Sequence, residues 1–190
     1  MNTTKYEFMK EIMKINDPKL GMACVNLVQS VPEYFWTIPA SSTGKYHPEC
    51  DLGDGGLVRH SIMVATAADE LVTSEVFVED TPLNHDIARV AGLFHDVLKS
   101  GEVDDEGNYS AHTEFNHPLL AAKWIRSLLT FEGIDETIVD EICLAIESHM
   151  GKWNTSKYSD AVLPVPSSPM EKLVHTADYV ASRKWVKGLW

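Results

Sequence analysis

Apolar residues recur at helical spacing along almost the whole chain, and the alternation of apolar and polar residues that marks a strand is weak. The clearest segment is residues 57–71, in which apolar side chains and His60 fall on one stripe of a helix. No internal repeat or low-complexity tract interrupts the pattern. It predicts an all-α protein whose helices pack as a bundle.

Helix start signals locate several of these elements. Asp17 followed by Pro18 is an N-cap with proline at the first helical position, and Asn116 with Pro118 repeats the arrangement. Residues 168–171, Ser-Pro-Met-Glu, read as a capping box. The predicted helices cover residues 17–31, 57–71, 84–99, 116–129 and 135–149, and a last one runs from 168 past Asp178 toward Trp185, with a further helix start in the first ten residues.

Two segments are irregular. Residues 32–56 are rich in glycine and proline and form a longer connection than usual, which makes this loop a candidate functional segment. Lys45 and Tyr46 within it could line a substrate entrance, although a solvated loop is the simpler interpretation. Residues 101–112, with Gly107-Asn108, predict a small hairpin or loop insertion.

Composition fits one domain. The chain has 190 residues, of which 44% are hydrophobic, enough for one substantial core. We expect a core at residues 57–186, with helices and the long loop of residues 1–56 packing on it, in a single domain spanning residues 1–190. No stretch resembles a signal peptide or a membrane span, so a cytoplasmic protein is expected. Three widely spaced cysteines without a CxxC pair indicate neither a disulfide framework nor a thiolate zinc site.

The net charge of -12 argues against a broad nucleic-acid-binding surface, because affinity for the phosphate backbone comes from clustered lysine and arginine. Duplex DNA is therefore not an expected partner. A small or single-stranded substrate remains open, since metal ions can hold phosphate inside an acidic protein. The sequence does not indicate the oligomeric state.

Four histidines and two aspartates lie at the edges of predicted helices and supply the candidate chemistry. Neutral imidazole and carboxylate suit Mn, Fe, Co, Ni or Zn, and a packed bundle can bring helix ends together. The six residues are His60, His95, Asp96, His117, His149 and Asp178. They indicate a metal-dependent hydrolase.

This ordered set resembles the HD-domain metal-dependent phosphohydrolase superfamily over residues 55–185 or so. Residues 148–152, Ser-His-Met-Gly-Lys, and residues 173–178, Leu-Val-His-Thr-Ala-Asp, are similar to the branch related to HD-domain 3′ to 5′ exoribonucleases. The resemblance implies a helical core that holds one metal ion with His60, His95, Asp96 and Asp178. It also implies that Asp96 bridges to a second ion, which His117 and His149 complete.

The resemblance implies a reaction and shows one departure. Two divalent ions a few ångström apart can deprotonate a bridging water and stabilise the attacking and leaving oxygens of phosphoryl transfer. The usual HD-x-G-K pattern reads His-Asp-Val-Leu-Lys at residues 95–99, with Leu98 where glycine is common. Leu98 leaves the ligands intact but puts the shape of the pocket beside Lys99 in doubt.

Four further residues are candidates for substrate contact. Lys99 lies one turn beyond the dipeptide and can reach a phosphate, although a lysine near a helix end also suits the helix dipole. Arg59 could clamp phosphate, but it points about 100° away from His60 on a helix, which favours a structural role. His175 is a candidate second-shell partner or substrate contact, and a hydrogen-bonded structural role is the safer expectation. Trp153, four residues after His149, is the best candidate for base stacking.

Other residues of the same types receive structural interpretations. His85-Asp86 is a second such dipeptide, and Asp86 is better explained as first-turn charge of its helix. His112 could exchange roles with His117 but belongs to the glycine-rich loop. Trp124 and Trp185 are expected in the core.

The leading hypothesis is hydrolysis of a phosphoester, mono- or diester, in a nucleotide or short single-stranded nucleic acid. The same six ligands occur in HD-type mixed-valent di-iron oxygenases, so this different chemistry stays open. A nucleotide-sensing module without catalysis is a third hypothesis, which the complete ligand set disfavours.

Overall fold

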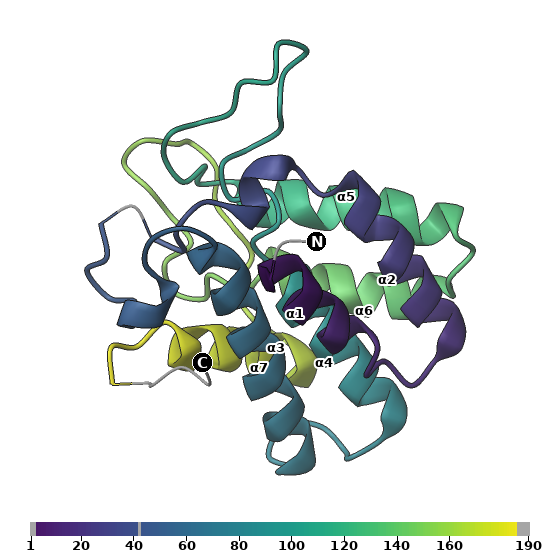
Figure 1. The fold of residues 1–190 in the computed structure, drawn as a ribbon. Coiled ribbons are helices and arrows are strands. Elements are labelled where there is room, and N and C mark those ends of the chain that lie inside the picture. The colour runs from purple at the N-terminus through teal and green to yellow at the C-terminus, as the bar shows by residue number, and fades with distance from the viewer. Residues whose placement is uncertain (1–2, 42, 186–190) are drawn as a thin grey trace.

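The computed structural model describes residues 3–41 and 43–185, and the expected core boundary at residue 186 lies outside them. The described residues form α-helices and two short 3₁₀ helices with no strand, so the all-α prediction is confirmed (Figure 1). The α-helices are α1 (Thr3–Ile12), α2 (Pro18–Ser30), α3 (Gly56–Thr73), α4 (Pro82–Phe94), α5 (His117–Phe131), α6 (Glu136–Glu147) and α7 (Pro169–Ala181), and the 3₁₀ helices are η1 (Glu33–Trp36) and η2 (Glu49–Asp51).

Helices α3 and α4 form the centre of the bundle, with α7 against α3 and α6 against α4. The two central helices approach closely at Gly92, where a Cβ atom would lie 2.7 Å from the Cα atom of Ala65. Real side chains do not tolerate this distance, so glycine sets the spacing of the two helices. Since His60 lies on α3 and His95 directly follows α4, this spacing also sets how near their side chains come.

The N-terminal helices pack on this centre. The Phe8 ring of α1 is fully buried and meets the rings of Phe35, Trp36 and Phe94 edge to face, at centroid distances of 5.7, 5.5 and 5.5 Å. Such pairs add to the hydrophobic stabilisation that ring burial already gives. Helix α2 lies against α5. Residues 3–36 and the later helices thus share one hydrophobic core.

The observed helix ends differ from the predicted ones near the candidate ligands His95, Asp96 and His149. The helix predicted at residues 84–99 begins at Pro82, because Thr81 accepts a hydrogen bond from the Asn84 amide, and it ends at Phe94. Beyond Phe94 the amides bond to carbonyl oxygens three residues back, as in the Val97 amide to the Phe94 carbonyl at 3.2 Å. His95 and Asp96 therefore lie in tight turns after the helix.

Similar shifts occur elsewhere. The helix predicted to reach residue 149 ends at Glu147, and the helix predicted to run toward Trp185 ends at Ala181. Trp185 was expected in the core, but its side chain is 72% exposed because the chain has already left the helix. Trp124 is partly buried against the core. The capping box of Ser168 and Glu171 is present as predicted.

The two irregular segments are loops. Residues 37–41 and 43–55 lie beside the start of α3. Two backbone hydrogen bonds hold them there, from the Leu57 amide to the Ile38 carbonyl oxygen and from the Gly55 amide to the Thr37 carbonyl oxygen. Residues 101–116 project from the bundle as a loop with a tight turn at Asp104, not as a hairpin of paired strands (Figure 1). None of the described helices is at once long enough and apolar enough to cross a membrane.

Candidate metal centre

The six predicted ligands come from five elements and converge on one place. His60 lies in the second turn of α3, and Asp178 lies in the last turn of α7. His117 opens α5, while His95 and His149 follow the ends of α4 and α6. The imidazole rings form a continuous series, with centroid distances of 5.4 Å for His60–His95, 4.8 Å for His95–His149 and 5.3 Å for His117–His149.

Three of these histidines are held by the same local contact. The Nδ1 atoms of His95, His117 and His149 lie 2.8, 2.6 and 2.7 Å from the carbonyl oxygens of Gly92, Glu114 and Ile146, each three residues earlier. A carbonyl oxygen only accepts, so each Nδ1 carries the hydrogen. The Nε2 lone pair is then free for a metal ion, which is the usual arrangement of a ligating histidine.

One group of ligand atoms gathers around Asp178. Its Oδ1 atom lies 3.1 Å from His60 Nε2 and 3.8 Å from His95 Nε2. All three residues offer ligand atoms within 4.8 Å of one another. Two imidazole nitrogens and a carboxylate oxygen are a donor set that divalent transition metals accept.

A second group gathers around Asp96, whose two oxygens face different histidines. The Oδ1 atom lies 2.8 Å from His117 Nε2 and 3.7 Å from His149 Nε2, whereas Oδ2 lies 3.4 Å from His95 Nε2. The Asp96 side chain is 2% exposed, so it has been removed from water. A carboxylate placed this way can serve two ions, one through each oxygen.

Buried polar atoms in this centre lack hydrogen-bond partners. His95 Nε2, His117 Nε2 and Asp96 Oδ1 are inaccessible to water and make no hydrogen bond. Unsatisfied buried donors and acceptors cost free energy, and their concentration at one point is typical of a metal site. Together with the donor types, these orphaned atoms show that the residues fit divalent metal ions.

Electrostatics also favours cations here. Burial lowers the pKa of His149 to about 3, with repulsion from His95 adding to the effect, so this imidazole is neutral at pH 7 and can act as a ligand. Burial opposes protonation of His60 too, but its contacts with Asp178 and Asp51 outweigh burial and raise the pKa to about 9. The space between His60 and Asp178 therefore favours a positive charge, carried by a proton or by a metal ion.

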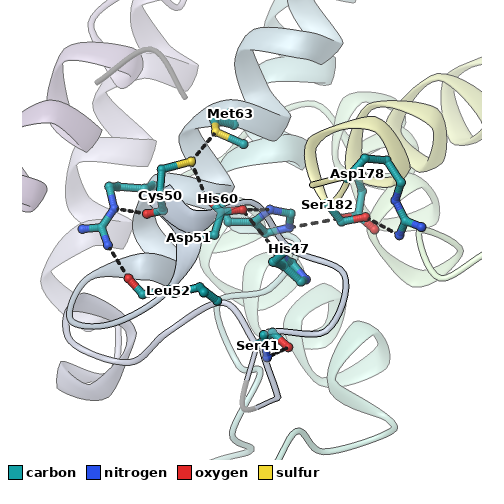
Figure 2. A network of polar contacts seen from close by, with 12 residues as sticks. Ser41, His47, Cys50, Asp51, Leu52, His60, Met63, Asp178 and Ser182 are labelled. Atoms are coloured by element: carbon teal, nitrogen blue, oxygen red, sulfur yellow. Dashed lines mark hydrogen bonds and ion pairs between the residues drawn. The ribbon is translucent and has the colours of Figure 1, made fainter. Parts of the chain in front are cut away.

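Asp51 and His47 also lie beside the centre and were not predicted from the sequence. Asp51, at the end of η2, is fully buried, and its Oδ2 atom lies 3.3 Å from the Nδ1 atoms of both His60 and His47. Figure 2 shows Asp51 and Asp178 at opposite sides of the His60 ring. Both missed residues lie in the irregular segment, where no periodicity shows which side chains turn inward. The available signal was a histidine and an aspartate four residues apart in a loop already considered functional.

Five of the six candidate ligands, all except His95, line a cavity of about 530 Å³. Lys99 lies in its wall, with its ammonium 2.5 Å from Asp96 Oδ2, so the structure brings this predicted substrate contact to the centre. His47, Ser41 and Tyr46 line the side formed by the irregular segment.

An aromatic wall completes the cavity. Trp153 stacks on Tyr179 with a centroid distance of 5.8 Å and an angle of 13° between the rings, and both residues line the cavity. The Arg183 guanidinium lies 4.3 Å from the centroid of the Tyr179 ring and 5.7 Å from that of Tyr46. Tyr179 and Arg183 follow the ligand Asp178 closely in sequence but were not singled out there.

Two predicted substrate contacts do not reach the cavity. The Arg59 guanidinium donates to the carbonyl oxygens of Cys50, Asp54 and Leu52 at 2.5, 2.9 and 3.0 Å, so it fastens the loop. This position corrects its assignment as a phosphate clamp and agrees with the structural alternative. His175 Nδ1 lies 2.7 Å from the carbonyl oxygen of His149. This contact holds the turn that carries His149, on the side away from the cavity lining.

The residues interpreted as structural lie outside the centre. The Asp86 carboxylate accepts hydrogen bonds from the backbone amides of Asn16 and Asp17 at 2.7 and 2.8 Å. His85 pairs with Asp69 and Asp80, and His112 is exposed on the loop.

Leu98, which replaces the common glycine, is buried in the core and is not part of the cavity wall. The departure from the usual pattern therefore leaves the cavity beside Lys99 open.

Comparison with known proteins agrees with this geometry. The family model described as HD domain matches residues 57–183, about two thirds of the chain. No curated protein and no solved structure matches the chain significantly. The match does not extend to the exoribonuclease branch, which stays a prediction. HD domains are broadly metal-dependent phosphohydrolases, and the histidines and aspartates of such a site are in place. The chain belongs to the HD-domain family.

Proposed function

We propose that this protein is a metal-dependent phosphohydrolase that cleaves phosphoesters of nucleotides or short single-stranded nucleic acids. The convergence of the six candidate ligands carries the proposal, and all of them except His95 line the cavity. The Nε2 atoms of His95 and His117 and the Oδ1 atom of Asp96 are buried without hydrogen-bond partners, and the cavity lies beside them.

The arrangement of Asp96 supports two ions. Its Oδ2 atom faces His95, on the side of His60 and Asp178, and its Oδ1 atom faces His117 and His149. When bound, divalent ions supply an activated water and the positive charge that phosphoryl transfer requires. Mn, Fe, Co, Ni and Zn all suit the donor set.

The chain's own side chains hold the substrate around this centre. The Lys99 ammonium pairs with Asp96 and lies in the wall, where it can also donate to a phosphate oxygen. Arg183 is held at the rim by hydrogen bonds from Nε to the Tyr179 carbonyl oxygen and from Nη2 to Ser182 Oγ, at 3.1 and 2.8 Å. Trp153, 44% exposed, offers an aromatic face to a base.

Metal analysis combined with hydrolysis assays tests the proposal. The metal-replete native protein should bind close to two ions per chain and hydrolyse nucleotides or short oligonucleotides, best with Mn, Co or Ni. His149→Ala should bind about one ion, because the second position loses a ligand. His112→Ala is the matched control and should keep the native ratio.

A native ratio near one would contradict the two-ion arrangement. Phosphate release that persists after proven metal removal would contradict the metal dependence. Consumption of O₂ during turnover would show the di-iron oxygenase chemistry in place of hydrolysis.

Trp153→Ala should raise KM for substrates that contain a base and leave KM for a generic aryl phosphate unchanged. A stacking contact is worth about 1–3 kcal/mol per base, which corresponds to roughly 5- to 150-fold in binding. Steady-state kinetics on both substrates measures the effect, and Trp124→Ala serves as a control in which the lost ring packs on the core. An equal rise of KM for both substrates would show that Trp153 does not bind the base.

A further inference from the structure

The pair of Asp51 and His47 lies beside the metal centre and is not part of the ligand set. Asp51 is completely buried, although a buried carboxylate is costly unless it is paired. Its partners are the Nδ1 atoms of two histidines, His60 and His47, each 3.3 Å from the same oxygen, Oδ2 (Figure 2). One carboxylate therefore contacts a metal ligand and a residue of the cavity wall.

The contact with His60 determines how this ligand can be used. The other ligand histidines donate from Nδ1 to backbone carbonyl groups, and His60 has Asp51 in the corresponding position. The Asp51 oxygen lies 3.3 Å from His60 Nδ1, which makes no hydrogen bond, and a carboxylate in this position favours a hydrogen on Nδ1. His60 Nε2 hydrogen-bonds to Asp178 Oδ1 at 3.1 Å, and a metal ion bound there would take the place of that hydrogen. A carboxylate behind a ligand histidine fixes its orientation and makes it a stronger donor.

The contact with His47 has a different outcome. His47 Nδ1 hydrogen-bonds to Asp51 Oδ2 at 3.3 Å, so Nε2 carries the lone pair, and His47 lines the cavity. Among the described residues, His47 groups with Asp51 and His60 but not with Asp178 or His95, so it lies one step away from the ligand cluster. A lone pair in this position can only accept a hydrogen bond, so its partner must carry a hydrogen. An ionised phosphate has no hydrogen to donate, whereas a sugar hydroxyl next to the bound phosphate does.

We infer that Asp51 is a positioning residue that orients His60 toward the metal and His47 toward a sugar hydroxyl of the substrate. The part that concerns the metal rests on the donor geometry alone. The part that concerns the sugar rests on the proposed function.

Cobalt(II) titration followed by absorption of the bound ion tests the first part. Asp51→Asn keeps the size of the side chain but removes its charge, and it should weaken cobalt binding on the order of 10- to 100-fold. Asp80→Asn removes a similar His–Asp pair outside the site, with His85 Nε2 at 2.9 Å, and should leave cobalt affinity unchanged.

A second control separates positioning from simple ordering of the loop. Arg59→Gln loosens the same segment, because Arg59 holds its carbonyl groups, yet it leaves the Asp51 carboxylate present. Cobalt affinity should fall less in Arg59→Gln than in Asp51→Asn when thermal unfolding shows that both variants are folded. Equal losses, or an unchanged affinity in Asp51→Asn, would overturn the positioning role.

KM for a ribonucleoside monophosphate and for its 2′,3′-dideoxy analogue tests the second part. The native protein should favour the ribonucleotide, and His47→Ala should remove this preference, worth roughly five- to tenfold for one hydrogen bond. His112→Ala, an exposed histidine, should keep the preference. Loss of bound metal in His47→Ala, or a preference that survives the change, would overturn the sugar contact. If neither nucleotide is hydrolysed while a short oligonucleotide is, the sugar contact fails and the proposed function stands. If none of the three is hydrolysed, both fail, and the cobalt result still decides the role of Asp51.

Discussion

At the level of single residues, the centre depends on which nitrogen of each imidazole makes a hydrogen bond to the protein. His95, His117 and His149 each use a carbonyl group three residues earlier, at the end or the start of a helix. For His95 and His149 these carbonyl groups, of Gly92 and Ile146, belong to the last turns of α4 and α6, where carbonyl groups lack intrahelical partners. The Glu114 carbonyl that serves His117 lies in the loop before α5. Local backbone geometry thus prepares three ligands before any metal binds.

The two His-Asp dipeptides should respond differently to substitution. Asp96→Ala should remove activity and most bound metal, because both of its oxygens face ligand histidines. Asp86→Ala should keep the metal but lose about 2–3 kcal/mol of unfolding free energy, since two backbone amides lose their acceptor. Elemental analysis and urea unfolding measure the two effects. Loss of metal in both variants would show that the wrong dipeptide was assigned to the site.

His85 should make stability depend on pH. Burial opposes its protonation, but Asp69 and Asp80 outweigh burial and raise its pKa above the ordinary 6.5. The protonated pair then stabilises the folded state fully below pH 6.5, and the contribution disappears as pH rises through the folded-state pKa. The difference in unfolding free energy between the native protein and His85→Gln should therefore shrink by up to about 1 kcal/mol from pH 5.5 to 8.5. A difference independent of pH would exclude this role.

The types and order of the six candidate ligands are specific in the sequence, and their side chains converge in the structure. Asp86 was predicted as first-turn charge of its helix, but the first turn of α4 holds no acidic residue, and Asp86 instead accepts hydrogen bonds from the backbone amides of Asn16 and Asp17.

Sequence reasoning missed Asp51 and His47, which come from a loop where side-chain direction depends on tertiary contacts. Arg59 is a residue whose chemistry the sequence could not decide. Its position next to His60 made it a candidate for binding phosphate, but in the structure its guanidinium binds carbonyl groups of the loop.

At the scale of elements, close helix packing brings the ligands together. Gly92 lets α4 approach α3 at Ala65, and these helices position His95 and His60. Sequence periodicity predicted both helices, but the end of α4 was placed five residues too late, at residue 99 instead of 94. The apolar residues Val97 and Leu98 continue the helical pattern although the backbone has tightened into turns.

Gly92→Ala should separate these two helices. The new Cβ atom would meet the Ala65 backbone at 2.7 Å, so the helices must move apart, at a cost of about 1–3 kcal/mol. Metal affinity should fall as well, because His60 and His95 would no longer converge. Gly21→Ala is the control, since its Cβ would lie 3.8 Å from Ile15, an ordinary contact. Urea unfolding with metal titration measures both, and a neutral Gly92→Ala would refute the packing argument.

At the scale of the whole molecule, the cavity wall combines distant parts of the chain. Tyr46 comes from the loop before α3, Thr113 from the projecting loop, Trp153 from the segment after α6, and Arg183 from the end of α7. The fold class could be predicted because helical periodicity is local. Of the aromatic and cationic wall, Trp153, Tyr46 and Lys99 were candidates from the sequence. Tyr179 and Arg183 were not, since their part in the wall depends on how loops fold over the bundle.

The overall charge sets a limit on substrates. With a net charge of -12, the protein gains little from release of counterions around a duplex, so duplex DNA should be neither bound nor cut usefully. Binding of a short single-stranded oligonucleotide should also depend only weakly on salt, because metal contacts and stacking provide the affinity. Fluorescence anisotropy at increasing salt checks both points. Efficient cleavage of duplex DNA would contradict this picture.

The Phe8 ring limits where the chain can be truncated without exposing its core. It is fully buried against Phe35, Trp36 and Phe94, and the last of these belongs to the segment that matches the family. A fragment that starts at residue 57 would lose three of these four rings together with Asp51 and His47. The stretch that matches the family model is therefore smaller than the hydrophobic core to which it belongs, and a truncation at its first residue would cut through that core.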